Sequence, residues 1–236
     1  MDVKIGRNGA GCRASLAGDG ILVDRVVSHS FRVTNIALRY GWMPGARYTN
    51  LRDVRRFPRL GFLDIDWKNY NFALHLSAAR ETRPKLTVAR DIVQLELLGQ
   101  TLDEAHELSQ YAEHVIVVPK DLRLTDRIEE LIPSQFRLGY SVPTRYGGTE
   151  IPLSSFTRPV HLLGGRPDVQ RRLAERLQVH SVDGNRFTLD ASFGDYFDGE
   201  IFRRHPVGGY EACIEDSIKN INSLWEKYCV CDRGVA

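Results

Sequence analysis

The stretch "HLLGGRPDVQRRLAERLQVHSVDGN", residues 161–185, has the pattern of a strand, a helix and a second strand. Its first apolar run ends on the glycine pair Gly164 and Gly165. A helix-like segment follows, with Pro167 near its first turn, where proline is tolerated. A second short apolar run ends on Asp183. Two such runs on either side of a helix predict parallel strands joined by a helical crossover.

The same alternation extends over most of the chain. We expect strands within residues 21–30, 60–67, 85–92, 114–120, 136–143, 159–165 and 178–185, the last of these being the final strand. We expect helices within residues 31–42, 69–82, 101–112, 124–132 and 166–177. The 101–112 helix should begin with a capping box of Thr101 and Glu104. Residues 44–59 are expected to form a loop or an irregular insert.

This order of elements predicts a (β/α)8 TIM-like barrel rather than an open doubly wound sheet, because 236 residues and unbroken alternation fit one such barrel. An eighth strand is expected in the N-terminal segment or around residues 150–157. Residues 213–228 should form a closing helix. Its apolar face would consist of Ile214, Ile218, Ile221, Leu224 and Trp225. We predict one domain over residues 1–236, with residues 1–20 as a flexible, glycine-rich lead-in.

The overall composition is that of an ordinary globular protein. A formal net charge of +2 is too small to indicate nucleic-acid binding by itself. No apolar run approaches the roughly 18 residues of a membrane span, and residues 1–13 lack the apolar core of a signal peptide. We therefore expect a cytoplasmic protein without a membrane partner. Its four cysteines, Cys12, Cys213, Cys229 and Cys231, should then be free thiols or metal ligands rather than disulfides.

Candidate site residues follow from the barrel, whose strands carry functional side chains at their C-terminal ends. The residues at those ends are Ser28, His29, Asp64, Asp66, Arg90, Asp91, Lys120, Ser141, Gly164, Gly165 and Asp183. Acids at the ends of three strands suggest a function for at least one of them, although each also fits a turn or a helix cap. Asp183 with Gly184 is equally a two-residue hairpin signal. Asp64 and Asp66 would point to opposite faces of one strand, so that only one would touch a substrate.

Several segments together resemble the tRNA-guanine transglycosylase superfamily, over about residues 60–190. Residues 159–185 resemble its strand of the form "vHLfGvG-P", its following helix and its nucleophilic aspartate at the end of the last strand. "FRLGYSVP" (136–143) resembles its glycine-rich base-binding strand. "GFLDIDW" (61–67) and "VARDI" (88–92) stand where the family has "DSGGF" and its second base-recognition acid. The short chain resembles the phage and bacterial branch that places 7-deazaguanine bases into DNA.

Two departures from the family pattern stand out. "DIDW" lacks the glycines of "DSGGF". The zinc signature Cys-x-Cys-x2-Cys with a distant histidine is matched only by Cys229 and Cys231, which Cys213 and His205 would have to complete in space. We therefore expect neither zinc nor another cofactor.

The resemblance implies that guanine in a nucleic acid is exchanged for a free 7-deazaguanine derivative, such as the 7-cyano base preQ0, through a covalent aspartyl-sugar intermediate. Asp183 would be the nucleophile and Asp64 the acid/base. The base would be bound by Asp91, Asp66, Gly139, Tyr140, Ser141, Gly164 and Gly165. Tyr140 would stack on it, with a core or rim tyrosine as the alternative. Arg52, Arg55, Arg56 and Arg59 would hold flanking phosphates, although by itself such a cluster more often forms a solvated loop or helix surface.

Other interpretations remain open from the sequence. DNA is favoured as the polymer, with tRNA as the alternative. A different barrel enzyme would use Lys120 as a Schiff-base lysine. A catalytically silent barrel would bind nucleic acid or a partner subunit instead. The sequence does not decide between a homodimer and a pair with another subunit. If the chain is phage-encoded, its location would be the host cytoplasm.

Overall fold

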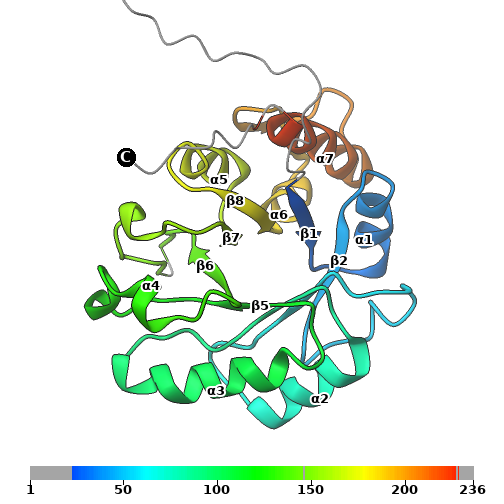
Figure 1. Ribbon diagram of the computed structural model, residues 1–236. Helices are drawn as coiled ribbons and strands as arrows, with labels where there is room; N and C mark the ends of the chain where they lie inside the picture. Colours follow the sequence, from blue (N-terminus) through cyan, green and yellow to red (C-terminus); the bar gives the residue numbers. More distant parts are fainter. Residues whose placement is uncertain (1–22, 146, 227, 229–236) are drawn as a thin grey trace, which may run out of the picture.

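A closed barrel of eight parallel strands forms the centre of the computed structural model, which describes residues 23–145, 147–226 and 228 (Figure 1). The strands are β1 (Asp24–Val27), β2 (Met43–Arg47), β3 (Phe62–Asp64), β4 (Leu86–Val88), β5 (His114–Val117), β6 (Arg137–Ser141), β7 (Val160–Leu163) and β8 (Val179–Asp183). They pair in chain order, and β1 pairs with β8 to close the ring. The predicted TIM-like barrel is confirmed.

Helices cover the outside of the barrel (Figure 1). They are α1 (Phe31–Leu38), α2 (Phe72–Thr82), α3 (Leu98–Leu108), α4 (Ile128–Leu131), α5 (Pro167–Leu173), α6 (Arg186–Ala191) and α7 (Tyr210–Glu226). Short 3-10 turns lie at η1 (Leu95–Leu97), η2 (Leu122–Leu124) and η3 (Leu153–Ser155). The β2–β3 connection, all of which is described, contains no helix. The described residues between β6 and β7 contain only the 3-10 turn η3, so these two crossovers depart from the regular pattern.

The eighth strand is β2, which lies, except for its first residue Met43, in the region 44–59 that the sequence predicted to be a loop. Residues 150–157 contain η3 instead of a strand. Strand propensity did not predict β2, because Pro44 and Gly45 are both poor strand formers. Gly45 is nevertheless required there, since a Cβ atom at this position would collide with Ser28 Oγ and Val26 Cγ1. Close packing between β1 and β2 therefore outweighs the low propensity.

The predicted capping box at the start of α3 is wrong. The helix begins at Leu98, so Thr101 lies inside it and is buried. The Glu104 side chain accepts hydrogen bonds from Arg90 Nη2 at 3.1 Å and Gln100 Nε2 at 2.8 Å. A long-range ion pair, rather than a helix cap, thus explains Glu104.

The chain after β8 also differs from the sequence prediction. Asp183 and Gly184 lead into α6 rather than into a hairpin. A separate antiparallel pair, β9 (Asp195–Phe197) and β10 (Phe202–Arg204), follows before α7. As predicted, α7 is the closing helix, and Ile214, Ile218, Ile221 and Trp225 are buried along it, while Leu224 is partly buried. This helix packs against α1, α6 and β9.

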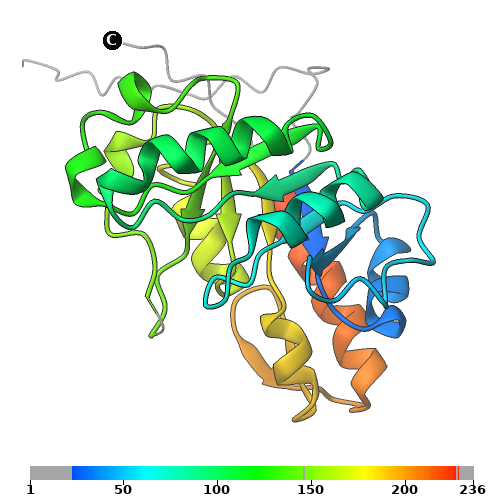
Figure 2. The ribbon, with the colours of Figure 1, turned by 90° about the horizontal axis from the view of Figure 1, so that it is seen from below.

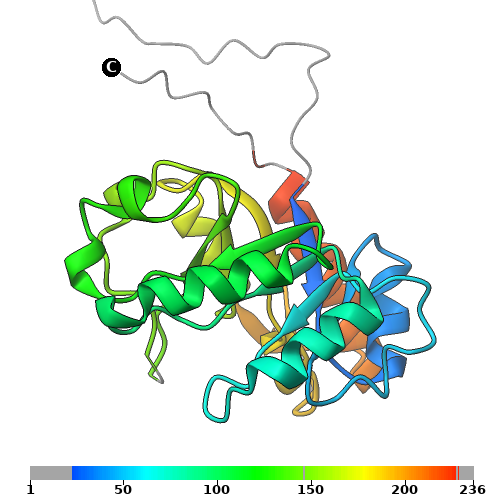
Figure 3. The same ribbon diagram turned by 60° about the horizontal axis from the view of Figure 1, so that its bottom comes forward.

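The loops at the C-terminal ends of the strands form the mouth of the barrel. Figures 2 and 3 show that the loop after β6 and the α6–β10 segment project on the same side of the molecule. The opposite ends of the strands face away from these loops. Both projecting segments therefore lie on the side of the molecule where the strands end.

Candidate active site

A cavity of about 320 Å³ lies in the mouth of the barrel. Its lining includes seven residues that the sequence singled out, namely Asp64, Asp91, Lys120, Ser141, Gly164, Gly165 and Asp183. They come from β3, β6 and β8 and from the segments that follow β4, β5 and β7. The structure therefore brings these seven residues together, and their chemical roles remain predictions.

Asp183 is the last residue of β8, and its carboxylate is fixed from β7. Its Oδ1 atom accepts a hydrogen bond from the Gly164 backbone N–H at 3.0 Å and lies 3.3 Å from His161 Nε2. Gly164 can present its N–H there because it adopts φ +64°, which suits glycine. These two contacts fix the orientation of the Asp183 carboxylate, which lines the cavity.

Further polar contacts, made by His161 and Gln170, hold the ends of the two strands that position this carboxylate. His161 is completely buried, and its Nδ1 atom lies 2.8 Å from Ser181 Oγ. The ring also stacks on Phe62, with centroids 5.1 Å apart. Gln170 Nε2 donates to the backbone carbonyls of Gly164 and Asp183, each at 2.8 Å. The ends of β7 and β8 are thus tied together.

Asp64 ends β3 and faces the same cavity. Burial, together with the negative charge of Asp183, raises the pKa of Asp64 to about 7. The Ile65 backbone N–H donates to Asp64 Oδ1 at 2.8 Å, and Arg47 Nε lies 4.0 Å from Oδ2; both oppose the rise. A carboxyl group with a pKa near neutrality is suited to give and take a proton.

Asp91 and Lys120 lie across the mouth from Asp183, because β4 is opposite β8 in the ring of eight strands. Lys120 Nζ is 2.7 Å from Asp91 Oδ2, and both side chains are largely shielded from solvent. The Lys120 backbone N–H donates to the Ile92 carbonyl at 3.0 Å, which fixes the two segments side by side. The pair offers an acceptor and a donor next to each other.

The sequence did not identify Arg47, His161 and Trp67 as site residues. Arg47 was hidden in the missed strand β2, where it is the register partner of Asp64. His161 is a polar residue within an otherwise apolar strand, and this pattern could have identified it from the sequence. Trp67 lines the cavity although 62% of its surface is exposed, and Lys68 Nζ lies 5.1 Å from its ring centroid.

Three predicted base-binding residues do not line this cavity. Asp66 lies beyond the end of β3, and its Oδ1 atom accepts from the backbone N–H of Lys68 at 3.1 Å, as a turn residue does. Tyr140 is buried, and its ring meets Phe156 edge-on at 5.3 Å, because alternate residues of β6 face opposite sides. Gly139 faces inward, but a Cβ atom there would lie 2.7 Å from Val118, so it serves packing inside the barrel.

The predicted phosphate-binding arginines divide into two pairs. Arg59 forms an ion pair with Glu113, which precedes β5, and Arg55 lies 3.8 Å from Glu81 near the end of α2. Both acids belong to the end of the barrel opposite the mouth, so these two arginines are misplaced for the predicted role.

The other two arginines lie on the side of the mouth. Arg56 lies over the ring of Phe31, the first residue of α1. Arg52 Nη2 is 3.1 Å from Asp53 Oδ2.

A second cavity of about 350 Å³ lies beside the first, between the segments that follow β1, β2 and β8. The two cavities share Arg47, Asp64 and Asp183. The carboxylate pair therefore lies where the cavities meet.

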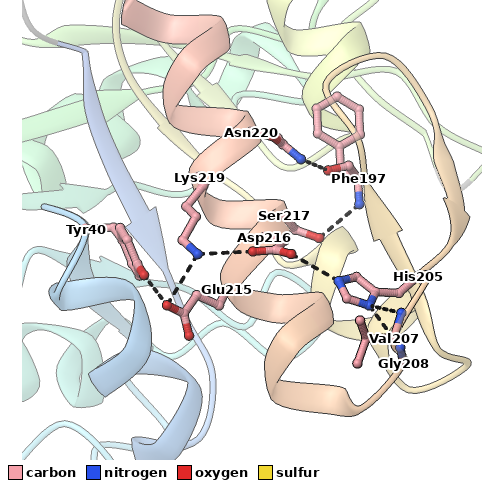
Figure 4. Close-up of polar contacts among 10 residues, drawn as sticks. All are labelled: Tyr40, Phe197, His205, Val207, Gly208, Glu215, Asp216, Ser217, Lys219 and Asn220. Carbon is pink, nitrogen blue, oxygen red and sulfur yellow. Dashed lines mark hydrogen bonds and ion pairs between the residues drawn. The ribbon is translucent and has the colours of Figure 1, made fainter.

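The described residues contain no group of three or more His, Cys, Asp and Glu side chains placed to hold a metal ion. Cys213 is buried in α7. His205 is held by Asp216 Oδ2 at 3.0 Å and by the backbone N–H groups of Val207 and Gly208 (Figure 4). Cys229, Cys231 and Cys12 lie outside the described residues. No helix within the described part of the chain is long and apolar enough to cross a membrane.

Comparisons with known proteins give a family and a similar solved structure. The structure is the YdjI aldolase from Escherichia coli K12, with 10% sequence identity, a TM-score of 0.48, and coverage of 88% of this chain and 90% of that chain. No curated protein matches the sequence. A family of unknown function, DUF6610, matches residues 37–226. The match spans most of the chain, which therefore belongs to the DUF6610 family.

Proposed function

We propose that this protein is an enzyme that exchanges guanine in a nucleic acid, DNA in the first place, for a free 7-deazaguanine base. The observation that carries the proposal is the pair of carboxyl groups at the junction of the two cavities. Asp183 is oriented by His161 and Gly164, whereas Asp64 has a pKa raised to about 7. Two carboxyl groups in different environments can divide the roles of nucleophile and acid.

In the first half of the reaction, an Asp183 oxygen attacks C1′ of the target nucleotide. The bond from C1′ to the base nitrogen breaks, and its electron pair stays on the base. Asp64 donates its proton to the departing base and becomes a carboxylate. The sugar is left esterified to Asp183, after a transition state with positive charge at C1′ that nearby carboxylates stabilise.

In the second half, the incoming base takes the place of the guanine. Asp64 removes the proton from its ring nitrogen, and the freed electron pair attacks C1′ from the face that the guanine left. The bond from C1′ to Asp183 breaks, and both carboxyl groups return to their starting states. Two displacements at C1′ retain the configuration of the sugar.

The rest of the first cavity suits a flat base. Asp91 would accept from the N1–H and N2–H groups of a guanine-like edge. Trp67 offers a large exposed ring at the rim, and a base stacked on an aromatic side chain gains about 1–3 kcal/mol. A base in duplex DNA would have to be flipped out of the stack, at a cost of a few kcal/mol.

The test is incorporation of radiolabelled guanine into duplex DNA and, separately, into a tRNA transcript, with Asp183→Ala as the control. Label in DNA that depends on Asp183 supports the proposal, and label in tRNA supports it with the alternative polymer. If neither polymer takes up label, and preQ0-type bases give the same result, the exchange reaction is excluded. An adduct that still forms with Asp183→Asn would remove Asp183 from the role of nucleophile.

A further inference from the structure

We infer that a third cavity, at the end of the barrel opposite the mouth, binds a phosphate group. It has a volume of about 480 Å³ and lies between the β2–β3 connection, the end of α2 and the turn that joins α3 to β5. Its lining includes Arg59, Arg83, Gln110, Tyr111 and Glu113. The cavity is separate from the carboxylate pair, so the inference goes beyond the proposed exchange reaction and does not depend on it.

Two guanidinium groups at this cavity are not neutralised by an acid. Arg83 lines the cavity, and Arg80 lies in the last turn of α2. Both groups lie over the ring of Tyr111, 5.6 and 5.5 Å from its centroid. Neither forms an ion pair with a carboxylate of the described chain. Glu113, the one acid among the described lining residues, is already paired with Arg59. The cavity therefore has an excess of positive charge.

The backbone of Arg83 has a conformation that favours glycine. Arg83 follows α2 with φ +40° and ψ +63°, and it is the one residue other than glycine with positive φ in the described chain. Its N–H donates to the Ala79 carbonyl at 2.9 Å, and Pro84 follows, so the chain leaves the helix through this left-handed residue. Glycine adopts the conformation without strain, whereas a β-carbon makes it costly. Strained residues of this kind are concentrated at functional sites.

The helix end alone does not explain an arginine at this position. The end of a helix has a partial charge of about −0.5, which favours a nearby cation. Arg80 already supplies that cation in the last turn. Two guanidinium groups exceed what the helix end can balance, so an anion in the cavity still meets a net positive charge. We therefore attribute Arg83 to the ligand that its guanidinium group can bind.

A phosphate group fits the donors of this cavity. A guanidinium group donates two parallel N–H bonds to phosphate oxygens, and Gln110 adds an amide donor. Tyr111 packs against the hydrophobic core, and its contact with the two arginine side chains restrains them before a ligand arrives. Restraint of this kind lowers the entropy lost on binding. Free nucleotides and the backbone of a nucleic acid both supply the phosphate group.

The test is a titration of 15N-labelled protein with pyrophosphate, followed through the backbone amide NMR signals. We expect saturable shifts at Arg83, Gln110 and Glu113. Arg83→Gly should weaken binding at least about tenfold because it removes a charge-assisted pair, and Arg83→Lys should recover part of the loss, since an ammonium group lacks the fork of donors. Glycine suits the left-handed backbone, so the Tm of Arg83→Gly should not fall and unfolding cannot account for the loss.

Arg171→Gln is the matched control. The Arg171 guanidinium also lies over a tyrosine ring, 5.6 Å from the centroid of Tyr228, but Arg171 does not line the cavity. This variant should bind pyrophosphate as tightly as the wild type does.

Thymidine monophosphate and a short thymidine oligonucleotide, neither of which contains guanine, distinguish the two sources of phosphate. Tighter binding of the oligonucleotide assigns the site to a polymer, and equal binding assigns it to a free nucleotide. The inference is overturned if pyrophosphate shifts none of the three amide signals, or if Arg83→Gly binds it as tightly as the wild type. Because the titration requires no exchange activity, failure of the proposed function would leave this result unchanged.

Discussion

His161 Nε2 lies 3.3 Å from Asp183 Oδ1 across the neighbouring strands β7 and β8, and Ser181 Oγ lies 2.8 Å from the other ring nitrogen. If the serine hydroxyl donates to Nδ1, the imidazole carries its proton on Nε2 and donates to Asp183. His161 has no exposed surface and does not line either cavity. It is therefore a positioning residue for the proposed nucleophile.

We expect His161→Leu to lower the rate of covalent adduct formation roughly ten- to a hundredfold, because the Asp183 carboxylate loses a donor that fixes its direction. His161→Gln retains an N–H donor and should recover part of that rate. The KM for the free base should stay unchanged, since the side chain lies beneath the cavity. Single-turnover kinetics on both variants check the prediction, and equal loss from both would show a general packing defect instead.

The pH dependence of the exchange reaction follows from Asp64. Its pKa of about 7 keeps the carboxyl group largely protonated below that pH, in the form that can protonate a departing base. We expect kcat/KM to fall as the pH rises through about 7 and Asp64 loses this proton. Asp64→Asn should be slow and should lack this alkaline limb. A profile between pH 5.5 and 9 decides the matter, and an alkaline limb retained by Asp64→Asn would assign it to another group.

Stability should depend on pH through the same group. The ordinary pKa of an aspartate is about 3.9, so between pH 4 and 7 the folded protein binds more protons at Asp64 than the unfolded chain does. The free energy of unfolding then decreases as the pH rises through this window, by at most about 1.4 kcal/mol per pH unit, and levels off above it. Asp64→Asn removes this contribution. Urea unfolding should show the variant gaining stability over the wild type from pH 5 to pH 8, and a constant difference would contradict the pKa.

The sequence predicted most of the barrel because buried parallel strands give continuous apolar runs and amphipathic helices separate them. It missed β2, where Gly45 is dictated by the approach of Val26 in β1 and of Ser28 just after β1, which no local pattern records. It also missed the start of α3, because the partner of Glu104 is Arg90, in the segment after β4. Secondary-structure propensity depends on neighbouring residues in the sequence, whereas tertiary contacts determine the position of β2 and the role of Glu104.

The sequence could predict those residues of the candidate site that lie at the ends of predicted strands. Asp64, Asp91 and Asp183 end or follow strands, so barrel topology alone gathers them around one mouth. Tyr140 was assigned to the base because the sequence did not fix which face of β6 it occupies, and a shift of one residue reverses the faces. The arginines after β2 could not be placed because that connection runs from one end of the barrel to the other.

The glycine pair after β7 gives a matched comparison of backbone strain and steric fit. Gly164 and Gly165 both have positive φ, +64° and +90°. A Cβ atom on Gly164 would meet nothing within 4 Å, whereas one on Gly165 would lie 2.5 Å from Val142 Cγ1. We expect Gly164→Ala to cost about 1 kcal/mol from its left-handed backbone and Gly165→Ala to cost a further 1–3 kcal/mol from overpacking. Chemical denaturation checks this order, and equal costs would show that Val142 yields freely.

Trp67 allows a test of base stacking that does not depend on folding. Most of its ring faces solvent, so truncating it removes little packing, and Trp67→Ala should change the free energy of unfolding by less than about 0.5 kcal/mol. If a base stacks on the ring, the same variant loses about 1–3 kcal/mol of binding, which is a rise of about five- to 150-fold in the KM for the free base. Trp67→Phe keeps a smaller aromatic face and should fall between the wild type and the alanine variant. Exposed Leu74, on α2 and not lining the cavity, supplies the control Leu74→Ala, for which neither quantity should change. An unchanged KM in Trp67→Ala would place the base away from this rim of the mouth.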